Sequence, residues 1–67
     1  MKRKDLTTLT DIQLARYFVS TNESTMTAPR DKYLELSREA NRVREYGLKM
    51  YGAERWEHLT NRIYANR

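Results

Sequence analysis

An apolar repeat between residues 33 and 50 constrains the fold of this chain more than any other feature. Apolar or small residues recur there at alternating intervals of three and four, and they are Tyr33, Leu36, Ala40, Val43, Gly47 and Met50. Side chains at this spacing share one side of an α-helix, so the repeat predicts a long helix over residues 28–51. Pro29 fits the first turn of that helix, where a backbone N–H would have no partner. Ala40 and Gly47 occupy equivalent positions, and their small side chains would let another helix approach closely.

A capping box at Thr10 marks the start of an earlier helix. The Thr10 hydroxyl can accept a hydrogen bond from the amide of Gln13, and the Gln13 side chain can accept one from the amide of Thr10. Leu9 and Leu14 flank this box at the positions of a hydrophobic staple. The apolar stripe that follows consists of Ile12, Ala15, Phe18 and Val19. We therefore predict a helix over residues 11–21 and a polar connecting loop over residues 21–27.

The apolar repeat loses its phase at Gly52. Trp56, Leu59 and Ile63 form a new stripe that is out of register with Met50. We predict a break at Gly52 and a third helix over residues 54–64, with a single helix bent at Gly52 as the alternative. If the third helix does not fold back, its stripe is exposed and needs a second chain.

These elements predict an all-α fold with a single helical domain over residues 9–67, preceded by a flexible basic arm over residues 1–8. The first helix is about half as long as the second, so it can cover only part of it. A third helix that folds back from Gly52 could cover the remainder. We expect a helical hairpin extended by a third helix, an open arrangement in which both short helices run antiparallel to the long one. The predicted core consists of Ile12, Ala15, Phe18, Val19, Leu36, Ala40, Val43, Gly47, Met50, Trp56, Leu59 and Ile63.

The chain offers few groups for catalysis or metal binding. It has no cysteine and one histidine, His58, which lies four residues after Glu54. A carboxylate beside an imidazole could act as an acid–base pair, but no nucleophile, glycine-rich phosphate loop or set of metal ligands accompanies it. A solvent-facing pair is the simpler interpretation. We therefore expect a protein that is not an enzyme and carries no cofactor or metal.

A nucleic acid is one candidate partner, because the formal net charge is +4 at pH 7. The basic candidates for phosphate contacts are Lys2, Arg3, Lys4, Arg38, Arg42 and Lys49. A helix with spaced arginines could lie in a major groove while the N-terminal arm follows the phosphates. Acidic residues interrupt this surface, which favours a solvated face with salt bridges; they are Asp31, Glu35, Glu39 and Glu45.

A larger protein is the partner that the sequence favours. A chain of 67 residues has a small core, and such chains often gain support from a partner or from self-association. Tyrosine and arginine supply much of the binding energy at interfaces. The interface candidates of these two types are Tyr46, Tyr51, Tyr64, Arg42, Arg44 and Arg55. We predict a non-enzymatic helical regulator that binds a larger protein and modulates, most simply inhibits, its activity.

The expected location is the cytoplasm. The basic N-terminus leads into polar residues where a secretion signal would be apolar, and no apolar run is long enough to span a membrane. Binding to a membrane surface is disfavoured because the charged faces mix both signs. Self-association is kept as a further alternative.

The hairpin portion resembles a known family. The stretch Leu9-Thr10-Asp11-x-x-Leu14, followed by Arg30-Asp31 and a Tyr-Leu-Glu-Leu run, is similar to the helical hairpin of the Sda sporulation checkpoint proteins, which inhibit a histidine kinase. The resemblance covers about half of the chain; the Tyr17-Phe18 register is displaced, the loop is longer, and the third helix has no counterpart. It implies no residue roles here, and it illustrates how a small helical scaffold can bind and inhibit a larger protein.

Overall fold

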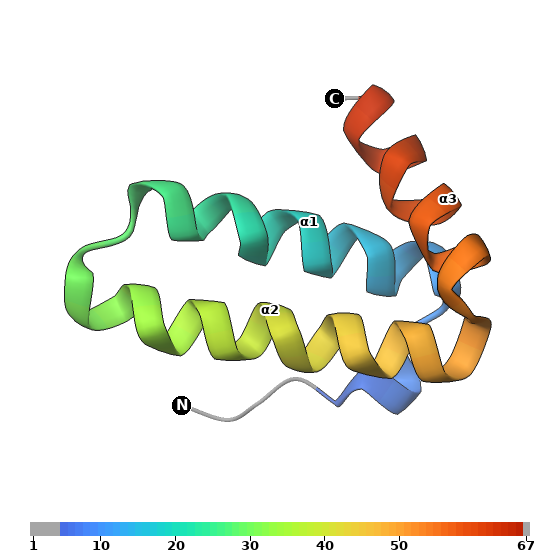
Figure 1. The fold of residues 1–67 in the computed structure, drawn as a ribbon, viewed down its shortest axis with the longest axis horizontal. Coiled ribbons are helices and arrows are strands. Elements are labelled where there is room, and N and C mark those ends of the chain that lie inside the picture. The colour runs from blue at the N-terminus through green and yellow to red at the C-terminus, as the bar shows by residue number, and fades with distance from the viewer. Residues whose placement is uncertain (1–4, 67) are drawn as a thin grey trace.

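The computed structural model describes residues 5–66, and within this range it is helical without strands. The elements are a 3-10 turn, η1 (Leu6–Thr8), and three helices, α1 (Asp11–Thr27), α2 (Arg30–Tyr51) and α3 (Ala53–Ala65). Helices α1 and α2 form an antiparallel hairpin, and α3 folds back onto one side of it (Figure 1). The predicted all-α, three-helix arrangement is confirmed. A break at Gly52 separates α2 from α3, so the alternative of one bent helix is wrong.

The start of α1 follows the capping signal in the sequence. The amide of Gln13 donates to Thr10 Oγ1 at 3.2 Å, and the amide of Thr10 donates to Gln13 Oε1 at 3.0 Å. These two bonds satisfy backbone N–H groups that have no partner inside the helix. Leu14 is fully buried and Leu9 packs against the core, as expected for a staple.

The predicted loop over residues 21–27 is wrong, because α1 continues to Thr27. The hydroxyl of Ser24 donates to the carbonyl of Ser20 at 3.0 Å, so this polar side chain is satisfied inside the helix. Thr21 is buried, which gives this segment tertiary contacts that its composition does not reveal. The helix ends only where Pro29 disfavours helical backbone at Ala28, whose ψ is 144°.

The link between α2 and α3 is a single glycine. Gly52 has a φ of +86° and a ψ of 158°, a combination that is nearly restricted to glycine. Its amide donates to the carbonyl of Leu48, and its carbonyl accepts from the amide of Trp56, each at 2.9 Å. One residue therefore ends one helix, begins the next and turns the chain sharply between them (Figure 1).

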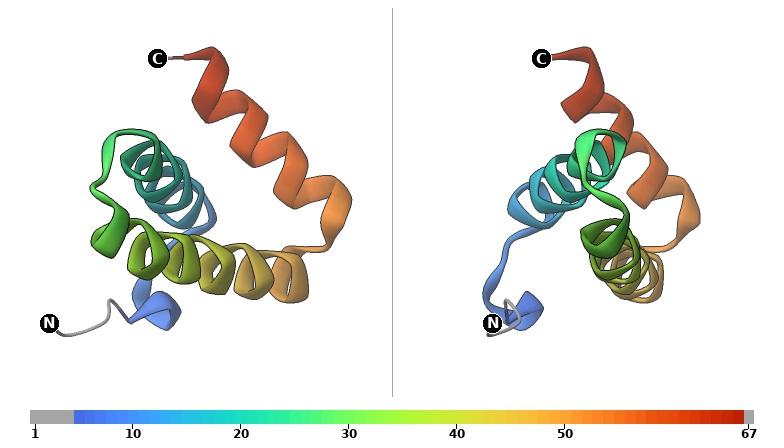
Figure 2. Two further views of the ribbon diagram at one scale, coloured as in Figure 1. Left: turned by 60° about the vertical axis from the view of Figure 1, so that its left-hand side comes forward. Right: turned by 90° about the vertical axis from the view of Figure 1, so that its left-hand side faces the viewer.

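Helix α3 does not run antiparallel to α2, which corrects the expectation from the sequence. It crosses the hairpin steeply, starting beside α2 and ending beside α1 (Figures 1 and 2). Near its start Trp56 lies against Gly47 of α2, and near its end the Tyr64 hydroxyl accepts from Asn22 Nδ2 of α1 at 3.2 Å. These two contacts on different helices fix the crossing.

The core lies where all three helices and η1 meet. Its central cluster consists of Leu6, Leu14, Ala15, Val43, Trp56 and Leu59. The Trp56 ring meets the Phe18 ring edge-on, with centroids 5.6 Å apart. Most of the predicted core residues are buried or half-buried, but Met50 is exposed and its assignment to the core is wrong. Met50 is in the last turn of α2, on a side that the other described elements leave open.

The turn η1 adds a core residue ahead of the predicted domain start. Leu6 is buried, and the carboxylate of Asp5 accepts from the amide and the hydroxyl of Thr7, at 3.0 and 2.6 Å. These bonds lower the pKa of Asp5 below its ordinary value. The predicted flexible arm therefore includes an ordered turn at residues 6–8. Residues 1–4 of that arm lie outside the described range.

Candidate protein-binding surface

Two lines of side chains run along the face of the hairpin that α3 covers. On α2 the line is Tyr33, Ala40 and Gly47, spaced by seven residues, and Gly47 contacts Trp56 of α3. On α1 the line includes Val19 and Asn22 and reaches Met26, and Asn22 contacts Tyr64 of α3. Residues seven apart lie on nearly the same side of a helix. The hairpin therefore presents a continuous face, and α3 crosses one end of it (Figures 1 and 2).

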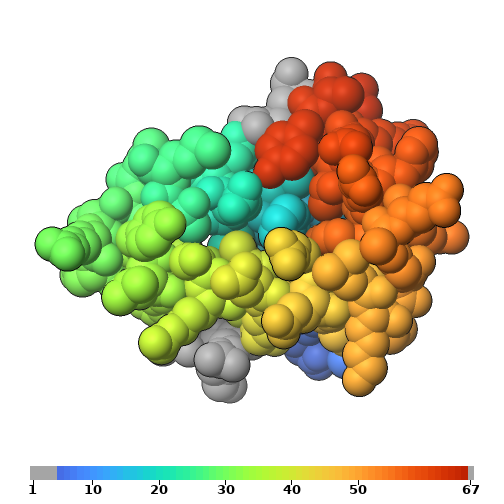
Figure 3. Space-filling model, in the orientation of Figure 1, coloured from blue at the N-terminus to red at the C-terminus, as the bar shows by residue number. Residues whose placement is uncertain are grey.

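Helix α3 stops before this face ends. Ala40 and Val19 are buried, whereas Tyr33 is 48% exposed and Met26 is 80% exposed at the ends of the same two lines. Tyr64, at the last turn of α3, is 41% exposed beside them. The space-filling view of this face shows α3 over one end of the hairpin and the green and yellow-green end left bare (Figure 3). We call the surface formed by Asn22, Met26, Tyr33 and Tyr64 the open end.

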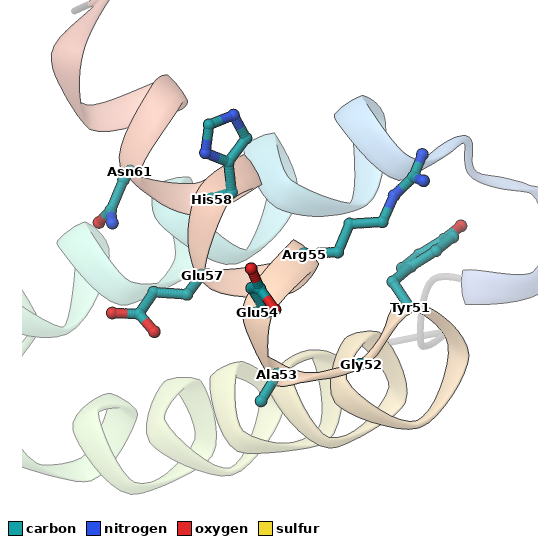
Figure 4. Close-up of a pocket in the computed structure, with 8 residues that line it drawn as sticks. All are labelled: Tyr51, Gly52, Ala53, Glu54, Arg55, Glu57, His58 and Asn61. Carbon is teal, nitrogen blue, oxygen red and sulfur yellow. The ribbon is translucent and has the colours of Figure 1, made fainter.

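At the opposite end of the hairpin, three charged or aromatic side chains form the corner between α2 and α3. Arg55 Nη2 donates to Asp11 Oδ2 at 2.9 Å, and the Arg55 guanidinium lies 5.7 Å from the centre of the Tyr51 ring (Figure 4). The bond to Arg55 lowers the pKa of the Asp11 carboxyl. The structure thus brings the predicted interface residues Tyr51 and Arg55 together, and it employs both in fastening α3 to the hairpin.

The predicted Glu54–His58 pair lies on the outer surface of α3, where both residues are exposed. Glu57 and Asn61 share the same shallow hollow (Figure 4). Neither Glu54 nor His58 makes a hydrogen bond or ion pair with another described residue. Within residues 5–66, no three His, Asp or Glu side chains come together as a set of metal ligands. The arrangement is that of a solvated helix face.

Arg42, a candidate in both binding hypotheses, is held by the hairpin itself. Its guanidinium donates to both oxygens of Glu39, at 2.5 and 2.9 Å, and Tyr17 of α1 donates to Glu39 Oε2 at 2.6 Å. Partial burial and the bond to Glu39 raise the pKa of Tyr17, and the same carboxylate raises the pKa of Arg42. This network connects α1 to α2, so the Arg42 side chain has a structural role in the hairpin.

The remaining predicted site residues are scattered. Tyr46 is half-buried and packs against the core, and Arg44 is exposed on α2. Arg38 and Lys49 are exposed three turns apart on α2, with Glu45 between them. The candidates at positions 2–4 lie outside the described residues. The six interface candidates therefore do not form one surface.

Met26 and Tyr33 are the functional candidates that sequence reasoning missed. Met26 falls in the stretch that was predicted as a loop, and Tyr33 begins the apolar repeat but was assigned neither to the core nor to the interface. The signal that could have found Met26 is its spacing of seven residues from Val19. This spacing is informative for Met26 only if α1 continues past Thr21. The exposure of Tyr33 depends on where α3 ends.

No family model, no curated protein and no solved structure matches the chain. The hairpin resemblance therefore adds no residue roles, and the geometry carries the functional argument. No helix within residues 5–66 is long and apolar enough to cross a membrane.

Proposed function

We propose that this chain is a non-enzymatic cytoplasmic interaction protein that binds a larger protein through the open end and modulates, most simply inhibits, its activity. The observation that carries the proposal is the exposure of Met26 and Tyr33 at the ends of two lines whose other members are buried or half-buried. Exposed apolar side chains that continue a core are stabilised when a partner covers them, because burial removes apolar surface from water. The open end is therefore a surface where a partner's apolar side chains would be stabilised.

Helix lengths indicate what the partner supplies. The 22 residues of α2 span about 33 Å and the 13 residues of α3 about 20 Å. Because α3 crosses the hairpin, it covers less than its own length along α2, so at least about 13 Å of the hairpin face is uncovered, which is enough for about two turns of helix. A short apolar segment of a partner, laid beside Tyr64, would continue the layer that α3 begins. Tyr33 and Tyr64 are suited to such a contact because tyrosine combines a large apolar ring with a polar tip.

A protein partner is better supported than a nucleic acid. Of the basic candidates within residues 5–66, Arg42 is paired with Glu39, and Glu45 lies between Arg38 and Lys49. Carboxylates among phosphate contacts would repel the nucleic-acid backbone. The open end, in contrast, needs no charge to be complementary to an apolar segment.

The test is a capture experiment with three forms of the tagged chain, each run with and without nuclease. The forms are the wild type, the double variant Met26→Gln with Tyr33→Gln, and the control Met50→Gln, which changes an exposed methionine at the other end of the hairpin. We expect the wild type and the control to capture one protein in stoichiometric amount, with or without nuclease. The double variant should not capture it. Circular dichroism of all three forms checks that each remains folded.

Two outcomes would overturn the proposal. Capture that is equal for the wild type and the folded double variant would show that the open end is not the binding surface. Capture of nucleic acid, with proteins lost after nuclease, would favour the alternative function. In that case Arg38→Ala and Lys49→Ala should reduce binding and flatten its dependence on salt, because fewer counterions are released.

A further inference from the structure

The outer face of α2 carries charged side chains that form no ion pair with any other of residues 5–66. This face lies opposite the core-facing residues Ala40, Val43 and Gly47. The outer face consists of Asp31, Leu34, Glu35, Arg38, Asn41, Arg42, Glu45, Leu48 and Lys49; all of these are exposed except Arg42 and Leu48, which are half-buried. Arg42 is paired with Glu39, and none of the other five charged side chains forms an ion pair with another described residue. Even Glu45 and Lys49, which are four residues apart, do not pair.

The order of these charges is self-complementary. From the start of α2 the face reads acidic at Asp31 and Glu35, basic at Arg38 and at Arg42, whose charge is balanced by Glu39, acidic at Glu45 and basic at Lys49. A two-fold axis through Asn41 would bring a second, antiparallel copy of the helix opposite the first. Arg38 would then lie within one residue of level with Glu45 of the second copy, and Lys49 within two residues of level with its Glu35, offsets of about 1.5 and 3 Å along the helix. A parallel pairing in register would instead set each charge against its own kind.

The uncharged residues obey the same symmetry. Leu34 and Leu48 each lie seven residues from Asn41, so Leu34 would face the exposed part of Leu48 of the second copy and the two asparagines would meet at the axis. The remainder of Leu48 packs against the core of its own chain. Leu34 is 62% exposed, which leaves most of an apolar side chain to be covered. A central asparagine pair fixes register in paired helices, because each amide is satisfied only by the other.

We propose that this chain self-associates as a two-fold symmetric dimer through the antiparallel pairing of the outer faces of α2. The surface is distinct from the open end, so the inference does not depend on the proposed function. One helix against one helix makes a small interface, and the dimer belongs to the weak and transient class. It therefore forms at high protein concentration.

The test uses charge reversal at residues that lie outside the core. In sedimentation equilibrium at tens to hundreds of micromolar, we expect the wild type to dimerise and each of Arg38→Glu and Glu45→Arg to dimerise about tenfold more weakly or worse, since each reversal turns two attractive pairs into repulsive ones. An equimolar mixture of the two variants restores dimers, because each then faces its complement. Arg16→Glu, an equal change of net charge at an exposed position on α1, is the control and should behave as the wild type.

Three results would overturn the proposal. The first is a wild type that stays monomeric over the whole concentration range. The second is a mixture of Arg38→Glu and Glu45→Arg that associates no more than either variant alone. The third is association that survives both reversals but is lost with Met26→Gln and Tyr33→Gln, which would place the second copy on the open end.

Discussion

The two ends of the hairpin have similar sequence patterns and opposite surroundings. At the covered end Leu14 and Val43 are fully buried, and Trp56 lies against Gly47. At the open end Met26 and Tyr33 continue the same helix faces but remain exposed. The difference is the third layer, because α3 reaches one end only. An apolar helical repeat therefore specifies which face of a helix can be buried. Whether that face is buried depends on the helices that pack against it.

A second contrast concerns how α1 and α2 are fastened. The covered end is held by apolar packing among three helices. The middle of the hairpin also uses polar bonds, in which Tyr17 and Arg42 converge on Glu39. A substitution that removes a buried apolar group lowers the free energy of unfolding strongly. A partly exposed hydrogen bond contributes only about 1 kcal/mol to that free energy. The two parts of the molecule should therefore respond differently to substitution and to pH.

Val43→Asp should have the largest effect, because it places an unpaired charge among fully buried side chains. The expected loss is about 3–5 kcal/mol, comparable with the whole stability of a small core. We expect no cooperative melting transition by circular dichroism. Leu34→Asp makes the same kind of change at an exposed position of the same helix and should alter stability by no more than about 0.5 kcal/mol. Equal losses in the two variants would refute the contrast between buried and exposed apolar positions.

Gly47→Ala should destabilise the covered end, although alanine is normally the better helix former by about 1 kcal/mol. A Cβ at this position would come within 2.6 Å of Trp56 Cδ2, so α3 must move. The expected cost is about 1–3 kcal/mol, measured by urea unfolding. The cost should shrink when Trp56→Leu is already present, because the obstructing ring is gone. A more stable Gly47→Ala variant would mean that α3 does not lie on α2 as described.

Tyr17→Phe should produce a smaller loss that depends on pH. At pH 8 the missing bond to Glu39 should cost about 1 kcal/mol. Folding raises the pKa of Tyr17, so its stabilising contribution is fully present below the unfolded value of about 10 and is lost as pH rises through the folded pKa. The urea midpoints of the wild type and Tyr17→Phe should therefore stay apart up to about pH 10 and converge over the range above it, where the folded pKa lies. A constant difference across this range would contradict the assigned network.

Met26→Gln should have the smallest effect on stability, within about 0.5 kcal/mol, because the side chain contacts little in the isolated chain. The same change should reduce capture of a protein partner if the open end binds one. Urea unfolding measures the first quantity and the capture experiment the second. A large loss of stability would mean that Met26 is packed in solution and that the open end is closed.

The sequence by itself determined where the helices begin and which of their faces are apolar. The capping box at Thr10 is a local signal, since its bonds join residues three apart. The break at Gly52 is local for the same reason, because few other residues adopt its backbone angles. The pattern around Val43 indicated the buried side of α2 without any knowledge of its neighbours. Helical class, helix number and most of the core follow from such short-range rules.

Only the tertiary structure decided where α1 ends, how α3 crosses and which apolar residues stay exposed. Polar residues after Thr21 favour a loop on propensity alone, but the burial of Thr21 and the contact between Asn22 and Tyr64 support further helix. The exposure of Met26 follows from the point at which a helix distant in sequence stops. These outcomes depend on contacts between residues far apart in the chain. A local pattern encodes which contacts a residue can make, and the packing of the whole chain selects those that form.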